Sequence, residues 1–149
     1  MRCTMLEMSL IKHCSPTLAS LKTANLFSYS YSTERDLRKS IRYWNEQMSC
    51  KGIRLTVMKK KDNRALIYVC RISKLESVLA NEDVAPFLKR YGYDGMGVDS
   101  ALRRLKKRLC SSEEFPHEIG IFLGYPLEDV TGFIENEGKG FVEVGFWKV

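Results

Sequence analysis

The amino-acid sequence predicts an α+β fold, in which an antiparallel sheet of four or five strands packs against amphipathic helices. Segments with a helical apolar repeat and segments with alternating apolar residues follow one another irregularly, without the strand–helix–strand alternation of a parallel α/β protein. The hydrophobic share of 44% and the charged share of 28% are those of a globular chain. The 149 residues fit one ordinary domain, 1–149, and no linker long enough to divide them is present in the sequence.

The N-terminal part predicts a helix, a cap and a strand. A helix is expected over 1–12. Its expected apolar face consists of Met5, Met8 and Ile11 or of residues next to them. Ser15 and Pro16 are typical of a helix cap followed by proline at the first helical position, so a second helical turn is expected there. A strand is expected over 26–31, where aromatic residues alternate.

The middle of the chain predicts a helix, two paired strands and further helices. Apolar residues recur at helical spacing within 33–50. Strands are expected at 53–57 and 66–69, and the second is expected to be central because it is apolar on both faces. Helical pieces are predicted over 73–91, followed by a strong helix over 98–110. The 33–50 and 98–110 helices are expected to cover one face of the sheet.

The C-terminal part predicts a helical hairpin and a final strand. Residues 119–123 have helical spacing, although a short strand is the alternative. Pro126 is typical of the start of a second helix. Phe141 to Val149 alternates and is expected to end the chain as a strand.

The charges are unevenly distributed along the chain. Residues 113–137 contain seven acidic residues and no Lys or Arg, within a chain of net charge +6. One basic and one acidic surface are therefore expected. Five of the six residues in 103–108 are basic, which makes this helix a candidate for nucleic-acid binding. Because such runs are usually solvated helix faces, nucleic acid is not the expected partner.

The composition also bears on location and metals. No apolar run has the length of a membrane-spanning helix, and no signal peptide is recognised, so a cytoplasmic protein with no membrane association is expected. Five cysteines occur without a C-x-x-C pair, which favours reduced, mostly structural thiols. No metal site is predicted, and cofactors are left open.

Two sets of candidate site residues emerge. Cys14 precedes the predicted helix start, where a thiolate would be favoured. A thiol enzyme or redox protein would use Cys14 as nucleophile, His117 as acid or base and Glu118 to orient His117. The other set would bind a ligand through polar contacts. Its members are His13, Lys22, Asn25 and Tyr125.

Three blocks of sequence resemble a known family. Residues 13–27 (HCSPTLASLKTANLF), 115–130 (FPHEIGIFLGYPLEDV) and 145–149 (GFWKV) are similar to the blocks of the domain-of-unknown-function 3793 family. In the last block, Phe146 stands where the family has Tyr. The resemblance implies a small cytoplasmic bacterial protein and assigns no catalytic residue.

The first two blocks also contain the candidate site residues, so we expect 13–25 and 115–130 to converge around one cleft. The leading interpretation is an accessory or binding protein that takes a small ligand, a cofactor or a partner protein in this cleft. The thiol-dependent enzyme and nucleic-acid binding through the basic helices are the alternatives. Oligomeric state is left open.

Overall fold

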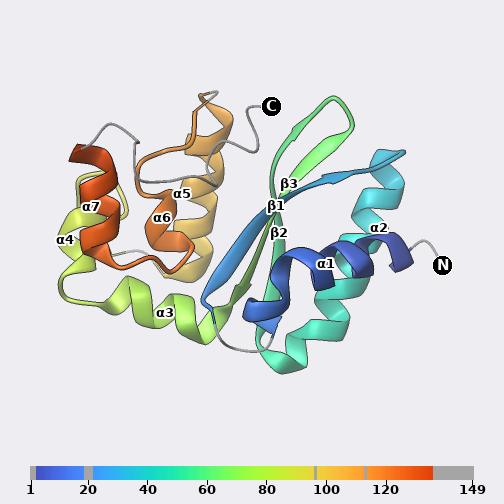
Figure 1. The fold of residues 1–149 in the computed structure, drawn as a ribbon, viewed down its shortest axis with the longest axis horizontal. Coiled ribbons are helices and arrows are strands. Elements are labelled where there is room, and N and C mark those ends of the chain that lie inside the picture. Colours follow the sequence, from blue (N-terminus) through green and yellow to red (C-terminus); the bar gives the residue numbers. More distant parts are fainter. Residues whose placement is uncertain (1–2, 19–21, 96, 113, 136–149) are drawn as a thin grey trace. The chain divides into compact units, whose positions relative to one another are not determined.

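The computed structural model describes residues 3–18, 22–95, 97–112 and 114–135 (Figure 1). The chain divides into two compact units, Met1–Lys74 and Leu75–Val149, and each is described by itself. Helices and an antiparallel sheet are both present, which confirms the α+β class. That all 149 residues form one domain stays a prediction.

The first unit contains a three-stranded antiparallel sheet in the order β1 (Ala24–Ser30), β3 (Arg64–Arg71), β2 (Ile53–Lys61). β3 is the central strand and is buried on both faces, as its two-sided apolar sequence predicts. Asp62 and Asn63 join β2 to β3 with φ values of 52° and 61°, the left-handed backbone of a two-residue hairpin turn.

The described residues therefore contain three strands where four or five were predicted. The predicted final strand, 141–149, lies outside the described residues.

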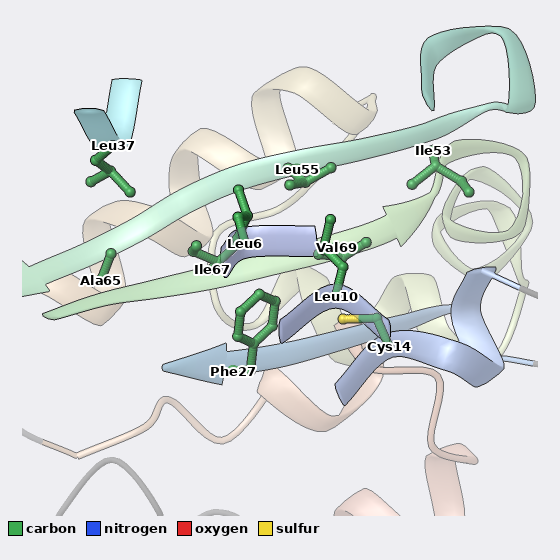
Figure 2. Close-up of a cluster of buried hydrophobic side chains, with 10 residues drawn as sticks. All are labelled: Leu6, Leu10, Cys14, Phe27, Leu37, Ile53, Leu55, Ala65, Ile67 and Val69. Carbon is green, nitrogen blue, oxygen red and sulfur yellow. The ribbon is translucent and has the colours of Figure 1, made fainter. Parts of the chain in front are cut away.

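Two helices pack on one face of this sheet, α1 (Cys3–Leu18) and α2 (Glu34–Met48). Figure 2 shows side chains of α1 lying over those of the strands. The buried cluster draws on both helices and all three strands. It consists of Leu6, Leu10, Cys14, Phe27, Leu37, Ile53, Leu55, Ala65, Ile67 and Val69. Of the two helices predicted to cover the sheet, 33–50 does so as α2; the position of 98–110 against the sheet stays a prediction.

The structure corrects the sequence interpretation of α1. This helix continues to Leu18, so Ser15 and Pro16 do not begin a new helix. The physical reason is a continuous buried stripe. It consists of Leu6, Leu10, Cys14 and Thr17, at helical spacing. Pro16 lies in the last turn, where a proline removes a single backbone hydrogen bond.

The buried face of this helix is formed by neighbours of the residues named in the prediction, Leu6 and Leu10. Met8 is 67% exposed and Ile11 is 55% exposed, because the buried stripe of the helix runs through Leu6 and Leu10 instead.

The α2 helix is capped at its start and tied to the sheet near its end. The Thr33 hydroxyl accepts a hydrogen bond from the Asp36 backbone N–H at 3.1 Å, which caps the first turn. Near the other end, the Asn45 amide accepts from the Leu55 N–H at 2.7 Å and donates to the Leu55 carbonyl at 3.0 Å. Because β2 is an edge strand of the described sheet, Asn45 satisfies backbone groups that point away from β3.

The second unit is helical in its described part. After α3 (Ile72–Ala80), which crosses the boundary between the units, come four further elements. They are α4 (Val84–Lys89), α5 (Val98–Cys110), α6 (Ile119–Phe122) and α7 (Leu127–Glu135). The bounds of α5 match the prediction. Residues 119–122 are helical, so the alternative of a short strand there is wrong. That α6 and α7 form a helical hairpin stays a prediction.

Candidate functional site

The block 115–130 is anchored by one buried carboxylate. Glu118 is fully buried and immediately precedes α6. Arg108 of α5 pairs with it through Nε and through Nη2, the latter 3.0 Å from Oε1. The Tyr93 hydroxyl donates to Oε2 at 2.8 Å. A buried charge is tolerated only when it is paired and hydrogen-bonded, and these two partners meet that requirement.

The pKa values of Tyr93 and Arg108 are both raised within this network. Burial and the adjacent Glu118 carboxylate raise the pKa of Tyr93 far above its usual range, so the phenol stays a donor. The hydrogen bond to Glu118 raises the pKa of Arg108. Arg108 also lies over the Tyr91 ring, with its guanidinium carbon 5.2 Å from the ring centre. Tyr93 and Arg108 therefore keep their protons near neutral pH, and their contacts with Glu118 hold α6 against α5.

A second arginine of α5 fixes the preceding loop. Arg104 donates to the Tyr91 carbonyl from Nε at 3.0 Å and from Nη2 at 2.7 Å. Gly92 has φ +93°, and a Cβ there would lie 2.6 Å from Arg104 Nη2. The basic run 103–108 is thus divided. Arg104 and Arg108 serve the fold, while Arg103, Lys106 and Lys107 are exposed.

The prediction that Glu118 orients His117 stays a prediction, and the described side-chain contacts of Glu118 go to Arg108 and Tyr93. His117 is exposed in the turn before α6. Both carboxylate oxygens of Glu118 accept hydrogen bonds from Arg108 or Tyr93. Neither of these partners is the His117 imidazole that Glu118 was expected to orient. Glu118 is placed as a structural anchor of the 115–130 block.

Tyr125, by contrast, lines a groove in the same unit. The groove has a volume of about 650 Å³. One wall comes from residues 78–84, at the end of α3 and the start of α4, and the other from 124–131, the turn into α7. A volume of this size is typical of small-molecule sites.

Both walls of the groove are fixed by hydrogen bonds. The Asn81 side chain accepts from the backbone N–H of Asp83 at 2.8 Å and of Val84 at 3.2 Å. On the other wall, Thr131 Oγ1 donates to the Leu127 carbonyl at 3.1 Å. The turn at Gly124, with φ +92°, follows α6, whose start Glu118 anchors. Fixed walls lower the entropy that a ligand must overcome on binding.

The charged groups of the groove have one sign. Asp83 and Glu128 are the charged residues among its described lining, which contains no Lys, Arg or His. Within the described residues, neither carboxylate forms an ion pair. Val84 and Leu127 contribute apolar side chains. The groove therefore combines uncompensated negative charge with apolar walls.

The candidate residues of the block 13–25 belong to the other unit. His13 is exposed, and its ring stacks on the Phe27 ring with the ring centres 5.3 Å apart. Partial burial and Lys12 lower the pKa of His13. The Asn25 side chain accepts a hydrogen bond from the buried Thr17 hydroxyl at 2.9 Å. Lys22 is half-buried. These contacts tie the end of α1 to β1.

Cys14 lies in surroundings that disfavour a thiolate. Its side chain is fully buried in the cluster of Figure 2. Burial raises the pKa of Cys14 to about 12, and the positive charge of Lys22 offsets this only in part. The residue stands near the end of α1, so the helix dipole expected at a helix start is absent here. Since Cys14 and His117 belong to different units, their pairing stays a prediction.

Sequence reasoning missed the other wall of the groove and the partners of Glu118. The Asn81 side chain forms an Asx turn with Asp83 just before a helix. The residue types in this segment indicate such a turn, but they do not indicate a groove. Tyr93 and Arg108 carry no signal of their own, because their meeting with Glu118 depends on tertiary packing.

The described residues contain no group of three or more His, Cys, Asp or Glu side chains that could hold a metal ion. In that same part of the chain, no helix is long and apolar enough to cross a membrane.

Fold and groove together define an α+β protein with an acidic, partly apolar groove between α3–α4 and the turn into α7. The chain belongs to the DUF3793 family, described as protein of unknown function, whose model matches residues 10–149. No curated protein and no solved structure matches the chain.

Proposed function

We propose that the protein is a cytoplasmic binding protein whose groove takes a small ligand with a positive charge and an apolar part. The observation that carries this proposal is that Asp83 and Glu128, from two different segments, both line the groove, with no basic residue among its described lining residues. A cation placed between them gains attraction to two carboxylates, while an anion is repelled by both. The apolar side chains of Val84 and Leu127, together with Tyr125, would hold the uncharged part of the ligand.

This proposal keeps the binding function predicted from the sequence and assigns it to residues 78–84 and 124–131. Tyr125 remains a ligand contact. Glu118 becomes a positioning residue, because it holds the start of α6 and thereby the turn that forms one wall. The predicted contribution of His13, Lys22 and Asn25 remains a separate proposal, since those residues belong to the first unit.

The test uses two probes that differ in charge alone. Phenethylamine carries an aromatic ring and an ammonium group, and phenylacetate carries the same ring and a carboxylate. Each is titrated into ¹⁵N-labelled full-length protein, and amide shifts are followed by NMR. We expect phenethylamine to move signals of 81–84 and 124–131, and phenylacetate to leave them in place. Equal shifts with both probes, or no shift in either segment, would overturn the proposal.

Variants separate the groove from general charge. Glu128→Gln should weaken phenethylamine binding about two- to fivefold, since an exposed charge pair contributes roughly 0.5–1 kcal/mol. The matched control is Asp129→Asn, which removes the neighbouring charge from the same first turn of α7 but does not line the groove. An equal loss in both variants would show that helix-end charge, and not the groove, attracts the probe.

A further inference from the structure

The face of α2 opposite its buried face is a stripe of four basic residues. The second, third and fourth of these residues follow the first by three, four and seven positions, so all four share one side of the helix over two turns. All four are exposed. They are Arg35, Arg38, Lys39 and Arg42. The buried face lies opposite and packs on the sheet through Leu37, with Ile41 and Trp44 beside it.

Little of this positive charge is neutralised locally. Glu34 lies 3.8 Å from Arg38, but its carboxylate is closer to Lys60, at 2.7 Å, and that hydrogen bond lowers the pKa of Glu34. Among the described residues, Arg35, Lys39 and Arg42 form no ion pair. Asp36 and Glu46 are the other acidic residues of the helix.

The unit around this helix is strongly basic. Met1–Lys74 contains 15 Lys and Arg and five Asp and Glu, a formal charge of +10, within a chain of net charge +6. The basic run of α5, in contrast, commits Arg104 and Arg108 to contacts inside its own unit. All four basic residues of the α2 stripe are therefore exposed, whereas only three of the five basic residues in 103–108 are.

An aromatic side chain adjoins the stripe. Tyr43 follows Arg42, lies one turn after Lys39, and is 41% exposed. Its ring meets the Trp44 ring edge to face, with centres 5.0 Å apart, so its orientation is supported from within the helix. A single-stranded nucleic acid matches this pattern. Its phosphates can pair with the cations, and each of its bases can stack on an aromatic face.

We propose that the α2 stripe, with Tyr43, binds single-stranded nucleic acid through its phosphate backbone. Arg35 to Arg42 span about 10 Å, at 1.5 Å per residue, which is enough to meet about three successive phosphates. Three of the four basic residues are arginines, whose planar guanidinium groups can each bind two phosphate oxygens. Tyr43 stacks one base beside the stripe. The binding is not sequence-specific, since phosphates and ring stacking carry no base identity.

The test measures salt dependence with fluorescein-labelled 15-mers of dT and of rU, by fluorescence anisotropy of the full chain between 50 and 200 mM NaCl. Three phosphate contacts give a slope of log affinity against log salt of about −2, or about 20-fold weaker binding over this range. The Arg35→Gln, Arg42→Gln double variant should halve the slope. The Lys106→Gln, Lys107→Gln variant on α5 loses the same charge and should keep the slope.

The remaining arms decide between ring stacking, other anions and general charge. Tyr43→Leu should weaken binding about fivefold or more with the slope unchanged. Circular dichroism confirms that each variant folds. Equal binding of dT and rU assigns the site to the phosphates and stacking bases that both oligomers share, and preference for one names the natural class. Equal slope losses in the α2 and α5 variants, or binding to phosphatidylserine vesicles without binding to either 15-mer, would overturn the proposal.

Discussion

Cys14 offers the sharpest test of how burial controls the chemistry of this protein. A pulse of iodoacetamide is applied to the folded protein at pH 8, and labelled peptides are quantified by mass spectrometry over time. Cys14 and Cys70 are buried, whereas Cys50 and Cys110 are exposed. We expect the two exposed cysteines to be alkylated first and Cys14 to lag far behind them.

The size of the lag follows from the pKa of the thiol. Burial raises the pKa of Cys14 to about 12, so roughly 10⁻⁴ of it is thiolate at pH 8. An ordinary exposed thiol, with a pKa of about 8.5, is about one quarter thiolate at that pH. The higher intrinsic nucleophilicity of the more basic thiolate recovers about 40-fold of this difference. The net chemical effect is about 60-fold slower alkylation, to which exclusion of the reagent from the core adds.

The control is the same pulse in guanidinium chloride, where all of the cysteines should react at similar rates. Alkylation of Cys14 ahead of Cys50 and Cys110 in the folded protein would refute this reasoning. It would also revive the interpretation of Cys14 as a nucleophile activated by a base such as His117.

Two further predictions concern stability. Glu118→Gln should lower the free energy of unfolding by about 2–4 kcal/mol, less than for a fully buried pair because the Arg108 side chain is 29% exposed. Urea denaturation measures this loss, with Glu114→Gln as the exposed control. Equal stability of the two variants would contradict the anchoring role. Burial raises the pKa of both Cys14 and Cys70 to about 12, so the unfolded chain releases these protons first and stability falls as pH rises from about 9 towards 12, by about 1.4 kcal/mol per pH unit for each thiol. An unchanged free energy of unfolding between pH 8 and pH 10.5 would show that the thiols ionise equally well in the folded protein.

Elements with strong local signals were predictable from the sequence. The α5 helix has its predicted bounds because its apolar residues recur at helical spacing and Gly97 precedes it. The central position of β3 follows from its two-sided apolar sequence. The turn at Asp62 and Asn63 follows from residue types that accept a left-handed backbone.

The α1 helix shows where local signals mislead. Ser15 and Pro16 are typical of a helix start, but the helix continues through them because Cys14 and Thr17 extend its buried stripe. Burial of a continuous stripe against a sheet outweighs one lost hydrogen bond. The chemical interpretation of Cys14 depended on that helix start and loses its electrostatic basis with it.

The candidate site divides in the same way. The sequence alone determined the helices and strands with clear periodicity, the uneven distribution of charge, and Tyr125 as a candidate contact, because these depend on residues close together along the chain. Only the tertiary structure decided that Glu118 meets Arg108 and Tyr93, that Asp83 and Glu128 face one groove, and that the basic stripe of α2 stays exposed. Contacts between distant segments depend on how whole elements pack, and packing is a property of the assembled core that no single segment encodes.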